Sequence, residues 1–548
     1  MQTKTQARFN PKKIFIVSCI VLFAGIIRIP SLTQPLGPDQ GIMSVIGEGI
    51  LNGELPYRDY WEMGSPAIFF TYALMFKIFG VSMAAVPITD ILVSMLTTWL
   101  IFLLARSIWD NKAGYISALL FAFFSNGVRL GMHAGGDIAF GTFWYISQRE
   151  TFMLPLIVAS VYFLLESERR KRHGVRMTLS GFSAGLAFVY KFPSLIIFLC
   201  LLFYLNLKSL FSNTPHPRKN LWQKNISFAS GFILALLPFG LFFTLTGALD
   251  EMVNVIFKYV FTVYGQIETN YLATIKMGLL NTLFIAKENF FLWIFSLASC
   301  VYIMAAQRFK ENVLVVLWAV GSLLFVASHR EFFGYHYLVV LPPLAVLSGY
   351  GWVKALGPKF HVGRMFSSEQ GKAFIIFALL ANLVFFTTLN YTHYTKFYYY
   401  STGKITQEEY YKFFNAYPEH DYSFPADYEA AQYIAQNTKS GDFIYTLGGI
   451  ESVIHFLSDR KSPSRFIFSW ILFSSTHGEV KQAEIYRREL LEDLRREKPK
   501  YIVTVRSLEN FQKFSEIYQF INTLYSLEKI FPDDRFLYVF NPNGGKKI

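Results

Sequence analysis

Five carboxylates gather in one short stretch of the sequence, directly after an apolar run long enough to cross a bilayer. A carboxylate at the edge of a membrane is costly to desolvate, so a chemical role explains it better there than on a soluble surface. Asp39 is the first candidate, as a general base. The alternative for Asp39 is an N-cap of a helix beginning at Gly41, because Asp is a favoured capping residue. The five residues, within positions 38–80, are Asp39, Glu48, Glu54, Asp59 and Glu62.

The composition places most of the chain in a lipid bilayer. The 548 residues are 53% hydrophobic and only 16% charged, whereas soluble proteins carry about 25% charged residues. The net charge of +13 fits basic residues kept in cytoplasmic loops, and nucleic-acid binding is not expected. All three cysteines, Cys19, Cys200 and Cys300, lie in apolar runs, which excludes a disulfide framework and a cysteine-based zinc site.

Eleven apolar runs reach or approach the roughly 20 residues that a helix needs to cross a bilayer. A further run at 66–79 is shorter and contains Lys77, so we expect an interfacial helix there. The distribution of basic residues favours a cytoplasmic N-terminus, and an odd number of spans then makes the C-terminal region extracytoplasmic. The eleven runs lie near 13–30, 83–105, 113–129, 150–166, 177–190, 192–208, 226–247, 288–305, 311–328, 335–354 and 372–391.

The composition changes near residue 392, where a polar and aromatic region begins. Segments 428–438 and 483–498 have helical periodicity, and 442–449, 499–505 and 536–542 are typical of strands. The sequence therefore predicts an α-helical polytopic membrane protein with about 11 transmembrane helices, interfacial helices and a small C-terminal α/β extracytoplasmic domain. The predicted domains are a catalytic transmembrane part at 1–391, with its first outer loop at 31–82, and the α/β domain at 392–548.

Several motifs occur in the order typical of the type C glycosyltransferases. Pro38-Asp39-Gln40 resembles the acidic motif after the first span of that superfamily, and ILNGELPYRDYW resembles its A-x-x-G-x-x-P-Y-x-D pattern. AFVYKFPSL is similar to a T-K-x-P turn, and HREFFGYHYLVVLPP is similar to an R-x-x-x-Y-x-x-x-x-x-P stretch. The resemblance covers about residues 13–390. It is a resemblance to protein O-mannosyltransferases and to the bacterial transferase that adds aminoarabinose to lipid A.

The resemblance implies an integral membrane enzyme that moves a sugar from a polyprenyl-phosphate donor to a hydroxyl group of a lipid, glycan or protein. In that reaction, on the outer face of the cell membrane, Asp39 takes the proton of the acceptor. The superfamily often has two adjacent carboxylates, but the second position here is Gln40. The resemblance therefore assigns the second acid to Glu150, with Asp137 as a competing candidate. The alternatives are an ion pair of Glu150 with Arg149 and an ordinary glycine-containing loop tip around Asp137.

A departing lipid phosphate needs cations to stabilise it. Lys191 is the single charge of a short outer turn, and Arg330 lies near His336 and Tyr337 at the start of a late apolar run. These four residues form the predicted phosphate site, in which Arg330 offers forked donors that a lysine cannot copy. The alternatives are a lysine that snorkels to the interface and an arginine that anchors the membrane edge.

Sugar or acceptor binding is predicted for a further set of residues in the first outer loop, together with Asp137. For the aromatic residues of this loop an interfacial belt is the favoured explanation. No cofactor has a defined ligand set: zinc binding by histidine is not expected, and a divalent ion held by carboxylates stays open. A transporter or flippase of an anionic glycolipid is the second interpretation, although the ionisable residues gather at the outer ends of spans rather than at breaks within them. The predicted loop residues are Tyr57, Arg58, Asp59 and Glu62.

Overall fold

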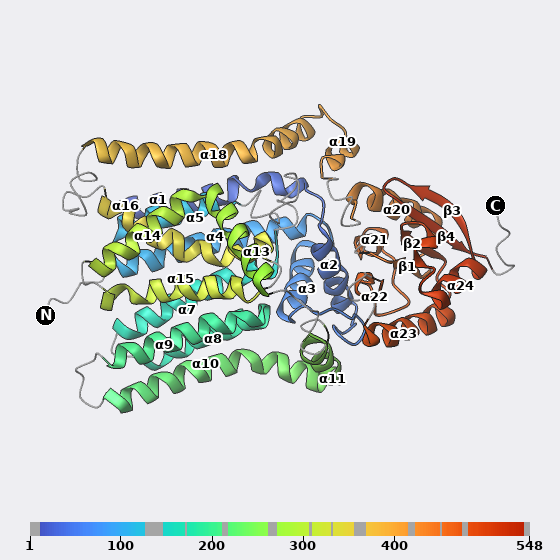
Figure 1. Ribbon diagram of the computed structural model, residues 1–548, viewed down its shortest axis with the longest axis horizontal. Coiled ribbons are helices and arrows are strands. Elements are labelled where there is room, and N and C mark those ends of the chain that lie inside the picture. Colours follow the sequence, from blue (N-terminus) through green and yellow to red (C-terminus); the bar gives the residue numbers. More distant parts are fainter. Residues whose placement is uncertain are drawn as a thin grey trace. The chain divides into compact units, whose positions relative to one another are not determined.

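The chain folds as two compact units, each assembled from three separate segments (Figure 1). Unit 1 comprises Met1–Leu32, Pro87–Pro238 and Asn270–Thr395, and unit 2 comprises Thr33–Val86, Phe239–Thr269 and Lys396–Ile548. Unit 2 therefore joins the predicted first outer loop to the C-terminal region, while the division into domains 1–391 and 392–548 stays a prediction. The computed structural model describes residues 11–126, 146–169, 173–210, 217–260, 263, 271–305, 309–329, 332–355, 369–414, 422–449, 452–473 and 480–541.

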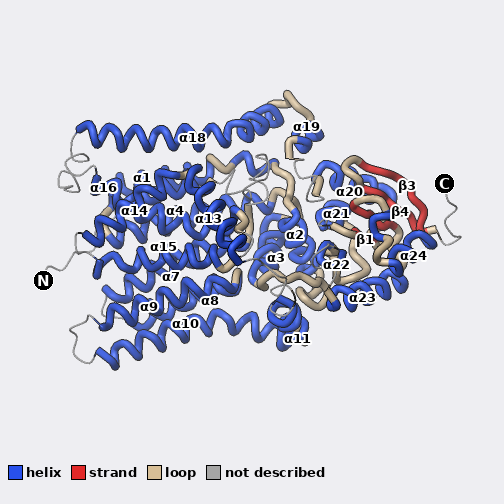
Figure 2. Tube along the Cα trace, in the orientation of Figure 1, coloured by secondary structure: helices blue, strands red, loops and turns tan. Residues whose placement is uncertain are grey.

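The described part of unit 1 is built from helices (Figure 2). Each of the eleven apolar runs overlaps one of them, and α13 lies where the sequence pattern predicts no span. The elements are α1 (Pro11–Ile26), η1 (Ile29–Thr33), α4 (Ala85–Ile108), α5 (Asn111–Phe124), α7 (Arg149–Arg169), α8 (His173–Tyr190), η2 (Phe192–Ser194), α9 (Leu195–Leu210), α10 (Pro217–Leu245), α13 (Tyr271–Glu288), α14 (Phe290–Ala305), α15 (Phe309–Ala327), η5 (Gly334–Val340), α16 (Leu341–Ala355) and α18 (Glu369–Ser401).

These helices pack around one apolar core. Helix α7 packs against α8, α8 against α9, α9 against α15, and α16 against both α5 and α14. Helices α8 and α10 approach so closely that a Cβ added at Gly231 would lie 2.0 Å from the carbonyl oxygen of Thr178. Small residues permit such close packing between apolar helices. Fully buried side chains of the core include Leu104, Phe124, Val158, Leu201 and Trp318.

Six helices within the described residues are long and apolar enough to cross a bilayer. The pair Leu272–Glu288 and Phe290–Met304, bent by 102° at its break, makes a seventh if it is counted as one span. Three apolar helices are shorter, among them Ala67–Phe79 at the predicted interfacial position. The count of about eleven spans stays a prediction. The six helices are Pro11–Thr33, Ala85–Ile108, Arg149–Arg169, Asn220–Leu245, Gly334–Lys354 and Glu369–Thr388.

The segment predicted as the first outer loop contributes two helices to unit 2, α2 (Pro38–Leu51) and α3 (Ala67–Phe79), which pack against each other. Proline is favoured at the first helical position because its missing N–H would be unpaired there anyway. Helix α2 also packs against α21 (Ser452–Ser458) of the C-terminal segment. A Cβ added at Gly41 would lie 3.1 Å from the backbone nitrogen of Val453, so this glycine allows the contact.

The C-terminal segment carries a four-stranded sheet of β1 (Ile444–Leu447), β2 (Tyr501–Val505), β3 (Tyr525–Phe531) and β4 (Arg535–Phe540), in the order β1-β2-β4-β3 (Figure 2). Strands β1 and β2 are parallel, with Ile444 opposite Tyr501, and the other two pairs are antiparallel. Helices α20 (Phe424–Asn437) and α21 pack on the sheet. The predicted α/β character is confirmed.

Strand β3 has no counterpart among the predicted strands. It is an edge strand of the sheet, in which Leu527, Glu528 and Ile530 are exposed and Lys529 is half-buried. Charged residues are common on edge strands, and they weaken the apolar signal of a strand. The remaining elements of unit 2 are α11 (Leu249–Val253), the π-helical turn η3 (Asn254–Tyr259), α19 (Gln407–Lys412), α22 (Trp470–Phe473), α23 (Lys481–Glu497), η7 (Leu508–Phe511) and α24 (Ser515–Leu524).

Candidate active site

A buried ion pair links helix α7 to the turn between α8 and η2 in unit 1. Glu150, in the first turn of α7, has a fully buried side chain, and the side chain of Lys191 is 13% exposed. The Lys191 ammonium donates a hydrogen bond to Oε1 of Glu150, a residue 41 positions away. Two charges are expensive to bury among apolar helices. The pair is therefore a candidate functional feature rather than a packing accident.

The end of helix α8 places the side chain of Lys191 next to this carboxylate. Helix α8 ends at Tyr190, and Lys191 has an extended backbone before the short helix η2. Pro193, inside η2, has no N–H and its ring would clash with a helical carbonyl four residues earlier, so α8 cannot continue. The side chain of Lys191 also lies over two aromatic rings, 5.4 Å from the ring centroid of Tyr335 and 6.0 Å from that of Phe325.

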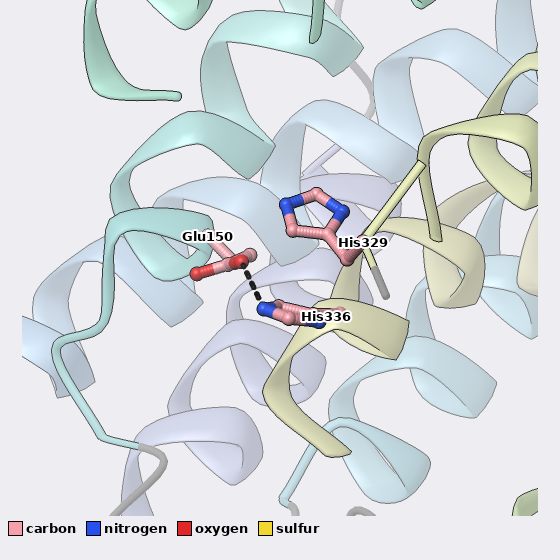
Figure 3. A group of neighbouring side chains, drawn as sticks. All are labelled: Glu150, His329 and His336. Carbon is pink, nitrogen blue, oxygen red and sulfur yellow. Dashed lines mark ion pairs between the residues drawn. The ribbon is translucent and has the colours of Figure 1, made fainter. Parts of the chain in front are cut away.

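Two histidines complete the cluster around Glu150. Figure 3 shows the side chains of Glu150, His329 and His336 pointing toward one another from three different segments. The Nε2 atom of His336 lies 3.9 Å from Oε1 of Glu150, and the two imidazole rings lie 4.1 Å apart between centroids. Burial lowers the pKa of His329 to about 2, and the nearby Lys191 ammonium acts in the same direction. His329 is therefore neutral at physiological pH.

The structure brings three of the predicted site residues together, and a fourth, Tyr337, follows one of them on η5. Glu150, Lys191 and His336 form the cluster. Tyr337 is buried, and its hydroxyl lies 2.8 Å from Oγ1 of Thr282 on α13. Arg330 and Asp137 lie outside the described residues, so their roles stay predictions.

Sequence reasoning missed the residue that anchors the chain before Glu150. The Oδ1 atom of Asp90, on α4, accepts a hydrogen bond of 2.8 Å from the backbone N–H of Ser147. Asp90 is buried, and Ser147 has a positive φ of 51°. The signal was available, because an acidic residue inside an apolar run is expected to be functional or tightly paired.

Asp39 lies in the first turn of α2, in unit 2, and its side chain is half-buried. The N-cap of this helix is Gly37, without a side-chain cap. The alternative in which Asp39 caps a helix from Gly41 is therefore wrong, because Pro38 starts the helix three residues earlier. A carboxylate in the first helical turn is stabilised by the positive end of the helix dipole.

The other predicted loop residues stabilise the loop that follows α2. Tyr57 is fully buried with a positive φ of 70°, and its hydroxyl donates to the carbonyl of Gly64. Arg58 pairs with Asp59 at 2.8 Å, and Glu62 accepts a hydrogen bond of 3.0 Å from the N–H of Gly64. Sugar or acceptor binding by these residues stays a prediction.

The carboxyl of Asp59 has an altered acidity. Partial burial acts to raise its pKa, but hydrogen bonds from the Arg58 guanidinium and from the backbone N–H of Leu55 outweigh it, and the pKa is lowered. Glu48 on α2 shows the opposite balance: burial and the nearby carboxylates of Asp459 and Glu54 raise its pKa. Of the two, Glu48 is therefore the one that holds a proton more readily.

Comparisons with known proteins place this architecture among solved structures. The family described as dolichyl-phosphate-mannose-protein mannosyltransferase matches residues 64–243. The structure of ArnT from Cupriavidus metallidurans in the apo state is similar with a TM-score of 0.58 and 14% identity, over 97% of this chain and 99% of that chain. The fold is that of the type C glycosyltransferases.

Two further structures share the type C glycosyltransferase fold. ArnT from Cupriavidus metallidurans bound to undecaprenyl phosphate matches with a TM-score of 0.57 and 13% identity, over 96% of this chain and 97% of that chain. The archaeal oligosaccharyltransferase AglB from Archaeoglobus fulgidus, in complex with an inhibitory peptide and a dolichol-phosphate, matches with a TM-score of 0.51 and 13% identity, over 97% of this chain and 74% of that chain. No curated protein matches the chain significantly by sequence.

Proposed function

We propose that this protein is an integral membrane glycosyltransferase that moves a sugar from a polyprenyl phosphate to a hydroxyl acceptor. The observation that carries the proposal is the buried Lys191–Glu150 pair at the start of α7, within a fold of the type C glycosyltransferases. Two of the similar structures were solved with a polyprenyl or dolichol phosphate, and an anionic lipid of this kind matches a lysine ammonium.

The chemistry requires one bond to break and one to form. The acceptor oxygen attacks the anomeric carbon, the bond between that carbon and the phosphate oxygen breaks, and the lipid leaves as a phosphate. Lys191 stabilises the charge that develops on the leaving phosphate, as preorganised cations do in phosphate chemistry. Glu150 orients the Lys191 side chain through their ion pair. Arg330, His336 and Tyr337 are proposed as further phosphate ligands.

Asp39 is proposed as the base that takes the proton of the acceptor hydroxyl. Its half-buried position in the first turn of α2, a helix whose N-cap is Gly37, supports this assignment. Tyr57, Arg58, Asp59, Glu62 and Asp137 are proposed to contribute to sugar or acceptor binding, directly or by holding the loop.

The proposed location of the reaction is the outer face of the cell membrane. The cytoplasmic N-terminus and the extracytoplasmic C-terminal domain follow from the basic residues of the predicted inner loops. The proposed partners are the polyprenyl-phosphate sugar, a lipid, glycan or protein acceptor, and the bilayer itself. The sugar is a hexose or a pentose, and mannose is the first to test because the matching family carries it in its description.

The test uses full-length protein in liposomes that contain a radiolabelled polyprenyl-phosphate sugar, beginning with mannose and followed by other hexoses and pentoses. We expect the protein to release or transfer the labelled sugar, and Lys191→Ala and Asp39→Asn to lower the rate about a hundredfold or more. Lys208→Ala is the matched control, because Lys208 pairs with Glu168 at the opposite end of α7, about 27 Å from Glu150. Scrambling of the labelled lipid between leaflets without sugar release would instead support the flippase.

A further inference from the structure

The cluster in Figure 3 offers the donor set of a metal site. One carboxylate oxygen of Glu150 and one ring nitrogen each of His329 and His336 lie within 4.8 Å of one another. The three residues come from α7, from the chain just after α15, and from η5. Three ligands on separate elements leave little freedom to the cluster, so its geometry is set by the packing of unit 1.

Two buried acceptor atoms in this cluster have no hydrogen-bond partner. The Nδ1 atom of His329 lies 2.8 Å from the carbonyl oxygen of Phe325. A carbonyl only accepts, so Nδ1 carries the proton and Nε2 presents a lone pair. This Nε2 atom is buried without a partner, and so is Oε2 of Glu150. Buried polar atoms are almost always satisfied in proteins, so an unsatisfied pair indicates a missing ligand such as an ion or a water molecule.

The hydrogen bond of His329 to a backbone carbonyl is itself a feature of metal sites. A metal-binding histidine usually donates its other ring N–H to a carbonyl or carboxylate, which fixes both the tautomer and the orientation of the ring. His329 has this arrangement through Phe325. His336 points its Nε2 atom at the same carboxylate.

Contrary to the expectation from the sequence, we propose that Glu150, His329 and His336 bind one divalent transition-metal ion of the zinc type. Two imidazoles and one carboxylate form a ligand set used for zinc with an open fourth position, whereas magnesium and calcium prefer oxygen ligands. Zinc bonds of about 2.0–2.2 Å require the ligand atoms to lie about 3.4 Å apart. The three side chains therefore close by roughly 1 Å when the ion binds, which small rotations supply.

Replacement of Lys191 should strengthen Zn²⁺ binding, whereas replacement of a ligand should weaken it. The Lys191 ammonium shares the Glu150 carboxylate and lies close to the proposed ion, so it competes with the ion for negative charge and repels it. Lys191→Met removes both effects, and the affinity for Zn²⁺ rises about tenfold or more. Loss of an imidazole ligand acts in the other direction, because His329→Gln and His336→Gln each weaken Zn²⁺ binding about a hundredfold.

The test measures Zn²⁺ binding to the full-length protein in detergent, after treatment with a chelator, by competition with a chromophoric chelator and by elemental analysis. We expect one equivalent per chain, binding that excess Mg²⁺ does not displace, and a visible absorption spectrum when Co²⁺ replaces Zn²⁺. His393→Gln is the matched control, because His393 is a buried imidazole on α18 of the same unit, and it retains the affinity of the unmodified protein.

Several results would overturn the proposal. The first is the absence of stoichiometric Zn²⁺ binding, which is expected if a water molecule occupies the site instead of an ion. The second is an equal affinity of His329→Gln and His393→Gln for Zn²⁺. The third is weaker Zn²⁺ binding by Lys191→Met than by the unmodified protein. Gel filtration shows whether each variant folds. Should His336→Gln fail to fold, His329→Gln decides, since His329 is only half-buried. These measurements do not involve sugar transfer, so a failure of the metal-site proposal can be distinguished from a failure of the proposed function.

Discussion

Replacement of Lys191 by methionine separates the structural role of the Lys191–Glu150 pair from its chemical role. Methionine keeps much of the length of the side chain but loses the ammonium. Glu150 then retains a fully buried carboxylate that has lost its ammonium partner, with the imidazole of His336 3.9 Å away. A buried charge that loses its partner destabilises a protein, whereas replacement of both partners by uncharged groups is often neutral.

The structure sets the expected size of each effect. Because the carboxylate is fully buried, Lys191→Met should lower the free energy of unfolding by about 3–5 kcal/mol. The double variant Glu150→Gln/Lys191→Met should recover to within about 1 kcal/mol of the unmodified protein, since no charge is left buried. Sugar transfer should not recover: both variants lose the cation that stabilises the leaving phosphate, which costs about a hundredfold or more in rate.

The assay follows denaturant unfolding in detergent by tryptophan fluorescence, with a chelator present so that the ion pair alone is compared, and transfer is measured in liposomes. Lys208→Met serves as the control, because Glu168 keeps Lys224 at 2.7 Å after that change. It should alter neither stability nor transfer appreciably. A double variant that transfers sugar at the normal rate would reduce the pair to a structural one. A double variant as unstable as Lys191→Met would refute the argument from burial.

Three further outcomes test unit 2 and the helix packing. Burial lowers the pKa of His455 to about 4, so the unfolded chain binds more protons between about pH 4 and 6.5 and stability is lost as the pH falls through that window, by up to about 3 kcal/mol; denaturation of His455→Gln should lack this component. Arg535→Met leaves the buried carboxylate of Asp427 without its 2.7 Å partner and should lower the free energy of unfolding by about 3–5 kcal/mol, whereas a fully stable variant would show that the carboxylate is neutral. Gly231→Leu places a side chain against the carbonyl of Thr178 and should prevent a monodisperse fold in gel filtration; a normal elution profile would show that α8 and α10 can separate.

Local properties of the sequence determined most of the secondary structure. The apolar runs became helices because the backbone N–H and C=O groups of a segment in lipid must be hydrogen-bonded within the protein. Only a helix or a closed barrel achieves this. Strands β1 and β2 lie inside the predicted segments, and β4 begins one residue before its predicted segment. These segments were recognisable because they are rich in β-branched and aromatic residues and are bounded by turn residues. Strand β3 was missed because the adjacent charged residues Glu528 and Lys529 interrupt the alternation of apolar and polar residues that is typical of a strand.

The sequence alone also selected Glu150, Lys191 and His336 as candidates, through motifs that resemble a known superfamily. Only the tertiary structure decided that they meet, that His329 joins them, and that Asp90 holds the chain in front of them. The same holds for the predicted first outer loop, in which the backbone N–H of Trp61 donates to the backbone carbonyl of Arg465, far away in the sequence. Hydropathy and periodicity describe each element by itself, whereas contacts between residues far apart in the chain depend on how the elements pack, and no local pattern encodes that.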